Sequence, residues 1–228
     1  MAHTDHAHAH AHSPTHTGLD EPDWSTMVDR AEREGERFVD IARQAAAWGA
    51  AARGAGAGAP PVRRVLDIGS GPGVGTCELA VLFPEAAVVA VDASQAMLAR
   101  ATERAERHGL AARVTTYRAA LPDGIEGPAA VAALGPADVV LASLSLHHVR
   151  DQPRALRALH ALVDPHGVVA IVELDDREHP TGLPETLHTV GFDVVRSTMV
   201  RHGQPDAVDQ DDIPAVVDRR IVIARPHP

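Results

Sequence analysis

The chain has 228 residues, of which 45% are hydrophobic and 23% are charged, and this composition excludes a collagen, a coiled coil and a wholly disordered chain. Acidic residues outnumber basic residues by 31 to 21. The net charge of -10 argues against a nucleic-acid partner, because phosphate backbones are bound through basic clusters. The sequence contains no run of about 18 apolar residues that could span a membrane and no apolar signal-peptide core, so we expect a cytoplasmic protein. The single cysteine, Cys77, excludes an intramolecular disulfide and a metal site built from several thiolates, and we expect it to be a buried spacer.

Residues 1–22 form a histidine-rich segment with almost no apolar side chains to bury, which predicts a disordered tail. Imidazoles in a flexible segment can chelate nickel, zinc or copper. We therefore expect incidental metal binding by the tail and no metal site elsewhere. The histidines concerned are His3, His6, His8, His10 and His12.

Residues 23–53 predict one amphipathic helix. Apolar side chains recur at helical spacing from Trp24 to Trp48, and a break of this helix near Gly35 is an open alternative. The apolar stripe has two interpretations, a lid over a bound ligand or simple packing against the rest of the domain. Residues 54–61 follow as a linker, since alternating glycine and alanine before two prolines sustain neither a helix nor a central strand.

Residues 62–228 alternate between short β-branched runs and longer helical patterns, which is typical of βαβ units in a parallel sheet. Most of the β-branched runs are continuously apolar, as expected for strands covered by helices on both faces. The sequence therefore predicts a doubly wound α/β domain. Its strands are predicted at about 63–68, 87–92, 112–117, 138–143 and 167–173, and its helices at about 75–83, 94–108, 128–134 and 151–163.

The end of the chain departs from this alternation. A short helix near 183–190 precedes two strands near 192–200 and 217–225, and the acidic loop between the strands has no helical period. Two strands joined in this way most simply form an antiparallel pair at one edge of the sheet.

A glycine-rich loop lies between the first predicted strand and the helix after it, in the stretch Val65-Leu-Asp-Ile-Gly-Ser-Gly-Pro-Gly-Val-Gly-Thr76. Its glycines let the backbone turn tightly and approach a ligand, with the N-terminus of the next helix aimed at that ligand. The spacing does not fit the dinucleotide fingerprint, whose sixth position falls on Val74 or Thr76. A phosphate-binding P-loop is excluded as well, because the chain contains no lysine.

An acid, Asp92, ends the second predicted strand, where it can accept hydrogen bonds from both hydroxyls of a ribose. With the glycine loop beside it, this arrangement resembles the cofactor site of class I S-adenosylmethionine-dependent methyltransferases. The resemblance covers about residues 62–175 and implies a mostly parallel, seven-stranded Rossmann-like sheet whose last two strands are antiparallel. It implies that Asp67 and the loop approach the amino-acid part of S-adenosylmethionine and that Asp92 binds the ribose. The cofactor-binding residues implied are Asp67, Gly69, Ser70, Gly71, Gly73, Asp92, Ala93 and Ser143.

The segment after the fourth predicted strand, Ser143-Leu-Ser-Leu-His-His-Val149, resembles the one that faces the methyl group in small-molecule members of this family. It makes His147 and His148 the candidate catalytic residues, as a general base or as substrate ligands, because imidazole titrates near neutral pH. One of the two adjacent side chains is expected to point into the core. Glu173, at the end of the fifth strand, either faces the same site or is solvated.

Two positions depart from the family pattern. His166 replaces the first glycine of the usual turn into the fifth strand, and no acid follows the third strand, where members of the family commonly bind the adenine amino group. Contact with adenine is then left to the backbone, to Tyr117 or Arg118, or to Asp123.

The leading hypothesis is transfer of a methyl group from S-adenosylmethionine to an O, N or S atom of a small molecule by in-line displacement, with no nucleic-acid or membrane partner. The alternative is a non-catalytic metal-binding or regulatory protein on a degraded methyltransferase fold. The missing acid after the third strand and the histidine-rich tail motivate that alternative.

Overall fold

The structure, a computed structural model, describes residues 26–53, 60–174, 182–203 and 216–227. The predictions for the histidine-rich tail and for most of the linker at 54–61 lie outside these residues. Within the described ranges, no helix is long and apolar enough to cross a membrane.

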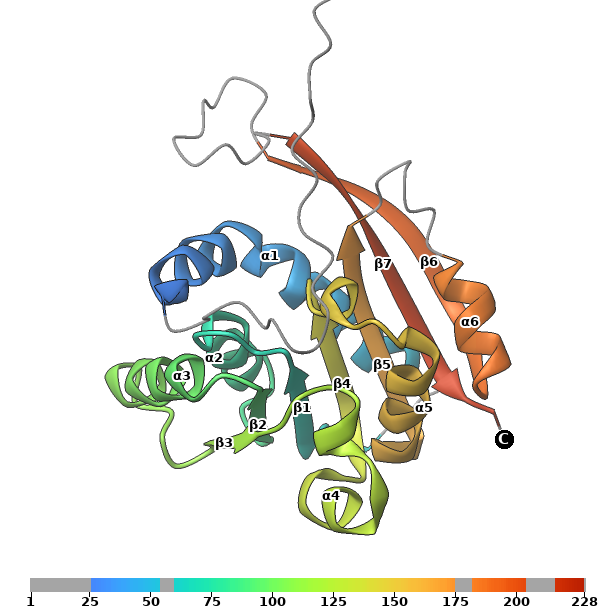
Figure 1. The fold of residues 1–228 in the computed structure, drawn as a ribbon, viewed down its shortest axis with the longest axis horizontal. Coiled ribbons are helices and arrows are strands. Elements are labelled where there is room, and N and C mark those ends of the chain that lie inside the picture. Colours follow the sequence, from blue (N-terminus) through green and yellow to red (C-terminus); the bar gives the residue numbers. More distant parts are fainter. Residues whose placement is uncertain (1–25, 54–59, 175–181, 204–215, 228) are drawn as a thin grey trace, which may run out of the picture.

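The fold is built on one seven-stranded sheet with the strand order β3-β2-β1-β4-β5-β7-β6 (Figure 1). The first five strands of the chain pair in parallel, whereas β7 is antiparallel to both β5 and β6. This confirms the predicted doubly wound sheet with an antiparallel pair at one edge. The strands are β1 (Arg64–Ile68), β2 (Ala87–Asp92), β3 (Val114–Arg118), β4 (Ala137–Ser143), β5 (Val163–Leu174), β6 (Phe192–Gly203) and β7 (Val216–Pro226).

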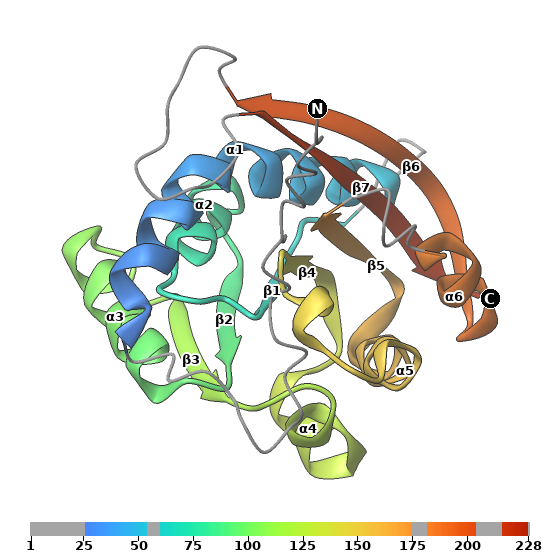
Figure 2. The same cartoon turned by 45° about the horizontal axis from the view of Figure 1, so that its top comes forward.

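Helices cover both faces of this sheet (Figure 2). Alternate strand residues point to opposite faces, so that Val65 and Val139 contact the layer of α1, α2 and α3, while Leu66 and Val140 contact the layer of α4, α5 and α6. Burial on both faces explains why the parallel strands are continuously apolar. The helices are α1 (Val28–Arg53), α2 (Val74–Leu82), α3 (Gln95–Arg107), α4 (Gly127–Leu134), α5 (Gln152–Leu162) and α6 (Leu183–Thr189).

The first helix, α1, is continuous through Gly35, as the prediction of one helix has it, and the alternative of a break there does not hold. A Cβ atom at Gly35 would lie 3.0 Å from Cγ2 of Val74, the first residue of α2. The glycine therefore lets the two helices approach each other and does not end α1. The second half of α1 buries Phe38 and Ile41 against the sheet, which supports packing for that half of the helix. The lid interpretation remains a prediction.

The fifth strand is longer than predicted, since it begins at Val163 and not near residue 167. Val163 pairs with Ala137 before the register shifts between Ala137 and Val139. The turn-forming residues Asp164 and Pro165 lie inside this irregular start, and for that reason the sequence resembled a loop there.

The parallel strands all end at the same edge of the sheet, which we call the carboxyl edge. The strand order reverses between β1 and β4, and ligands of open α/β sheets bind outside the carboxyl ends at such a switch point. The fold therefore gathers at this edge the loops after β1, β2 and β4 together with the end of β5.

Candidate cofactor and acceptor site

The loop after β1 is fastened to its two neighbouring strands. The backbone N–H groups of Gly69 and Ser70 both donate to the carbonyl of Val91, at 2.8 and 3.0 Å. Gly69 has a φ of 68°, and a Cβ atom there would lie 2.3 Å from Cβ of Ser145, which follows β4. Only glycine fits at this position, because it allows the left-handed backbone and the close approach of the β4 loop.

Two neighbouring positions of the loop, Gly71 and Ser70, leave room for a ligand or lack a polar partner. Gly71 has a φ of 53°, and a Cβ atom there would meet nothing within 4 Å. The adjacent Ser70 Oγ is buried and has no hydrogen-bond partner among the described residues. A buried hydroxyl without a partner is rare and calls for an explanation. An open backbone position beside it fits a loop that receives a polar ligand.

Asp67 is buried one residue before the end of β1, with 3% of its surface exposed. The Thr76 hydroxyl, in the first turn of α2, donates to Asp67 Oδ2 at 2.6 Å. Burial raises the pKa of Asp67 to about 6; the Thr76 hydrogen bond opposes this effect, and the charge of Asp92 adds to it. Asp67 therefore lies beneath the glycine loop and would be stabilised in its ionised form by a cation placed there.

Asp92 lies at the end of β2 with both carboxylate oxygens fixed by backbone groups. Gly71 N donates to Oδ2 at 2.9 Å and Ser94 N donates to Oδ1 at 2.8 Å. Ser94 also caps α3 by accepting from Met97 N at 3.3 Å. The two N–H groups therefore fix the orientation of the Asp92 carboxylate at the end of β2.

The turn after β4 is held from beneath by Glu173, at the end of β5. Glu173 is 4% exposed, so it is not solvated. Its Oε1 accepts from the backbone N–H of Ser145 at 3.1 Å and from that of Leu146 at 2.7 Å. Ser145 Oγ in turn donates to the Ile68 carbonyl at 3.1 Å. These bonds join the β4 turn to both β1 and β5.

The two candidate histidines lie in a short 3₁₀ turn, Leu146–His148, and both are exposed. The expectation that one of them points into the core is wrong, because Leu146 fills the core position of this turn. His147 Nδ1 donates to Glu173 Oε2 at 2.8 Å, and the two imidazole rings lie 3.9 Å apart between centroids. In a neutral His147, this contact leaves Nε2 as the hydrogen-bond acceptor.

Three side chains after β3 are candidates for contact with adenine, and their surroundings in the structure differ. Asp123 is engaged elsewhere, since its Oδ1 lies 2.7 Å from a guanidinium nitrogen of Arg154. Arg118 Nε donates to the carbonyl of Ala93 at 3.1 Å, which places Arg118 beside the end of β2. Tyr117 packs partly buried against the core. Arg118 is therefore the side chain best placed near the end of β2.

The structure brings most of the predicted residues to the carboxyl edge and adds three that sequence reasoning missed. Ser143 ends β4 and Ala93 follows Asp92, as expected from the strand positions. The missed residues are Thr76, Ser94 and Ser145, which hold the site residues in place. Of these, only Ser94 carries a sequence signal, as an N-cap directly before a helix.

The lone cysteine takes no part in this arrangement. Cys77 is buried in α2, and burial raises the pKa of its thiol. A raised thiol pKa disfavours the reactive thiolate, as expected for a spacer in the core.

Part of the chain is similar in sequence to known methyltransferases. Residues 65–167 match a protein-family model described as a methyltransferase domain. A trans-aconitate 2-methyltransferase of Variovorax paradoxus (strain S110) is 36% identical over 126 residues, which are 54% of this chain and 42% of that protein. The chain thus spans less than half the length of this relative.

Solved structures show the same fold at low identity. The precorrin-6y C5,15-methyltransferase of Geobacter metallireducens GS-15 aligns with a TM-score of 0.59 and 16% identity, over 82% of this chain and 86% of that one. A protein of Pyrococcus horikoshii proposed to be an RNA methyltransferase aligns equally well, with a TM-score of 0.59 and 16% identity over 82% and 84% of the two chains. Fold alone therefore does not select the class of methyl acceptor.

Proposed function

We propose that the chain belongs to the class I S-adenosylmethionine-dependent methyltransferases, since residues 65–167 match a methyltransferase domain. We propose further that it transfers a methyl group from S-adenosylmethionine to an O, N or S atom of a small molecule, and that it does so in the cytoplasm. One observation carries the proposal. The open glycine loop, Asp92 and the His147 turn held by Glu173 all meet at the carboxyl edge.

The residues at this edge fit the cofactor. When bound, S-adenosylmethionine supplies a methyl group on a positively charged sulfur. Asp92 would accept from the ribose hydroxyls, because its two oxygens are already oriented by the N–H groups of Gly71 and Ser94. The buried Ser70 hydroxyl would gain the partner that it lacks. The charge of the buried Asp67 carboxylate would favour the cationic amino-acid part of S-adenosylmethionine, bound on the other side of the glycine loop.

The acceptor end of the site is built around His147. Since Glu173 receives the Nδ1 hydrogen, the imidazole is oriented with Nε2 free to accept a proton from an acceptor hydroxyl or amine. Methyl transfer does not require such a base, because orientation alone can contribute roughly 7–11 kcal/mol. We therefore assign His147 to acceptor binding, with Glu173 as its positioning residue. Proton removal by His147 applies only to a hydroxyl or amine acceptor, because a carboxylate acceptor is already ionised near neutral pH.

An anionic small molecule is the acceptor that the remaining features favour. Arg219 lies on β7 opposite Leu174, at the carboxyl edge beside Glu173. Arg219 is 6% exposed. Its guanidinium packs on the Phe38 ring and donates from Nη1 to the Asp218 carbonyl at 3.4 Å, while its Nε has no hydrogen-bond partner among the described residues. The charge of Glu173 offsets part of the cost of burying this cation, and an anionic acceptor would offset more of it. The relatives named trans-aconitate 2-methyltransferase support a carboxylic acid as the first acceptor to test.

The test is transfer of a radiolabelled methyl group from S-adenosylmethionine to a panel of di- and tricarboxylic acids, with transfer RNA and total protein as competing acceptors. We expect label in the organic-acid fraction and at least a tenfold lower turnover in His147→Gln. His166→Gln removes another exposed histidine and should leave turnover unchanged. Label found only in RNA or protein contradicts the proposed acceptor class. Cofactor binding without transfer to any acceptor supports the regulatory alternative.

A further inference from the structure

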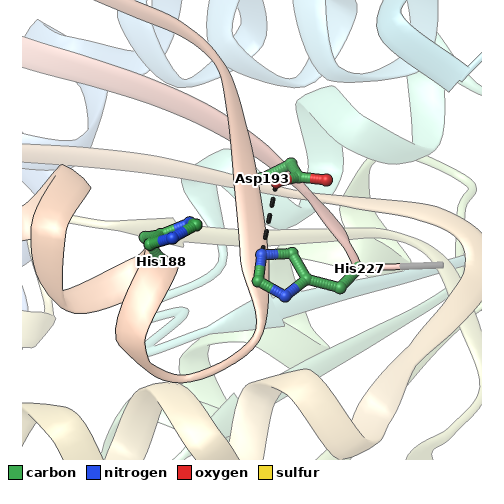
Figure 3. A group of neighbouring side chains, drawn as sticks. All are labelled: His188, Asp193 and His227. Carbon is green, nitrogen blue, oxygen red and sulfur yellow. Dashed lines mark ion pairs between the residues drawn. The ribbon is translucent and has the colours of Figure 1, made fainter.

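Three potential metal ligands meet at the far edge of the sheet, where α6, β6 and β7 come together (Figure 3). His188 lies in the last turn of α6, Asp193 is the second residue of β6, and His227 follows the end of β7. One ligand atom from each residue lies within 4.8 Å of the other two. Two imidazoles and a carboxylate therefore converge from three separate elements.

The backbone holds these three positions together. His227 N donates to the carbonyl of Gly191 at 2.8 Å, and the same carbonyl lies 3.0 Å from His160 Nε2. Asp193 pairs with Arg225 in the β6–β7 ladder. The fold thus fixes the three backbone positions, whereas the exposed side chains can still rotate.

The ligand set fits a divalent transition metal. His227 Nε2 and Asp193 Oδ1 are 3.3 Å apart, which is about the edge of a tetrahedron with zinc–ligand bonds of roughly 2.0–2.2 Å. The rings of His188 and His227 are 5.2 Å apart between centroids, so a small rotation of one exposed side chain brings the third ligand into range. Imidazole suits zinc, copper, nickel and iron, whereas magnesium and calcium prefer oxygen ligands.

We propose that His188, Asp193 and His227 bind one divalent transition-metal ion of the zinc class. Three protein ligands leave at least one coordination position for water. The ion would clamp the end of β7 to α6 and β6, and because it binds the folded chain it would raise the thermal stability. This site goes against the sequence prediction of no metal outside the tail. The three ligands are too far apart in sequence for a recognisable spacing.

The metal site is separate from the methyltransferase site. In the β5–β7 ladder, Glu173 pairs with Arg220 near the carboxyl edge, whereas Val169 pairs with Ala224 toward the opposite edge. His227 lies beyond Ala224, so the metal group lies at the edge opposite His147. The proposal therefore does not depend on the proposed function.

The test uses the full chain with the six tail histidines, at positions 3, 6, 8, 10, 12 and 16, replaced by glutamine, because they would bind metal themselves. Titration with Co²⁺ is followed by visible absorption, with Zn²⁺ added as a competitor. We expect one Co²⁺ per chain with absorption typical of four or five ligands, displaced by Zn²⁺.

Variants of the ligands decide the outcome. Loss of a residue that only hydrogen-bonds to a metal ligand typically weakens metal binding by about 10–100-fold. Loss of a ligand itself should therefore weaken Co²⁺ binding by at least about tenfold in His188→Gln, Asp193→Asn or His227→Gln. His108→Gln removes an exposed histidine at the end of α3 and should change nothing. Affinity for S-adenosylmethionine should be equal in all these variants. Absence of the Co²⁺ absorption, or equal losses in His108→Gln and His227→Gln, would overturn the proposal.

Discussion

Asp67 is a carboxylate whose environment opposes its ionisation. It lies beneath the glycine loop with one hydroxyl donor, and burial raises its pKa to about 6 from an ordinary value of 3.8. Because the folded state holds the proton more tightly than the unfolded chain, the free energy of unfolding falls as the pH rises from about 4 to 6. At about 1.4 kcal/mol per pH unit, the ionised form costs the folded state on the order of 3 kcal/mol.

Asp67→Asn should remove this cost. At pH 4.5 the variant and the wild type should have more similar stability than at pH 7.5, where the variant should be more stable by up to about 3 kcal/mol. Urea unfolding at both pH values measures the difference, and Asp123→Asn serves as the control with an exposed carboxylate. If the difference in the free energy of unfolding between wild type and variant is the same at both pH values, Asp67 has an ordinary pKa. If Asp67 also faces a cationic ligand, the stabilised variant should bind S-adenosylmethionine more weakly.

Gly71 and Gly109 form a matched pair for testing the loop. Both have left-handed backbone, with φ values of 53° and 69°, and a Cβ atom at either would meet nothing within 4 Å. Alanine at either position should cost roughly 1–2 kcal/mol of stability, for the same backbone reason. Only Gly71→Ala should lower the affinity for S-adenosylhomocysteine, by at least tenfold in a calorimetric titration, because its Cβ would enter the space beside Ser70. Equal affinities in the two variants would remove the loop from the cofactor site.

Among the elements, the turn after β4 depends most on a single side chain. Leu144 has a φ of 54°, an uncommon conformation for a residue other than glycine. Glu173 compensates by accepting the N–H groups of both Ser145 and Leu146 while it orients His147. The same carboxylate thus stabilises the turn and positions the candidate acceptor residue.

Glu173→Ala should therefore lose both stability and activity. Leaving buried N–H groups unpaired costs about 1–3 kcal/mol each, so the loss of both bonds should cost roughly 2–6 kcal/mol in urea unfolding. Glu126→Ala, which breaks a solvent-screened pair with Arg154, should cost much less stability than Glu173→Ala. His147→Gln should retain stability and lose turnover. A Glu173→Ala protein as stable as Glu126→Ala would show that the turn is held in another way.

The elements also show what the sequence could reveal. Strand positions were predictable because burial on both faces imposes continuous apolar runs, and the loop from Gly69 to Gly73 was predictable because only glycine fits its backbone. The role of Gly35 in α1 was not predictable, since this glycine makes room for Val74, which lies far away in sequence. Nor was the role of Glu173, because its three partners depend on how β4 and β5 align. A short stretch of sequence thus predicts a strand or a tight loop, whereas it does not predict which residues of other elements a side chain will contact.

At the scale of the whole molecule, charge bears on the acceptor. The net charge is -10 and the six aromatic residues make up 3% of the chain, so neither a basic surface nor a base-stacking platform is indicated. We predict that transfer RNA binds more weakly than a Kd of about 10⁻⁴ M at physiological salt, in a gel-shift assay with and without S-adenosylhomocysteine. Saturable binding below that concentration would favour a nucleic-acid acceptor over a small molecule.

The proposed function requires that the carboxyl edge of the sheet binds S-adenosylmethionine. Isothermal titration of the full chain with S-adenosylmethionine and with S-adenosylhomocysteine tests it directly, with Asp92→Ala as the variant that removes the ribose contact and Asp164→Ala as a matched surface control. We predict one site per chain for both ligands, unchanged in Asp164→Ala and lost in Asp92→Ala although circular dichroism shows that variant to be folded. No heat of binding to either ligand at millimolar concentration, or full affinity in Asp92→Ala, would contradict the claim.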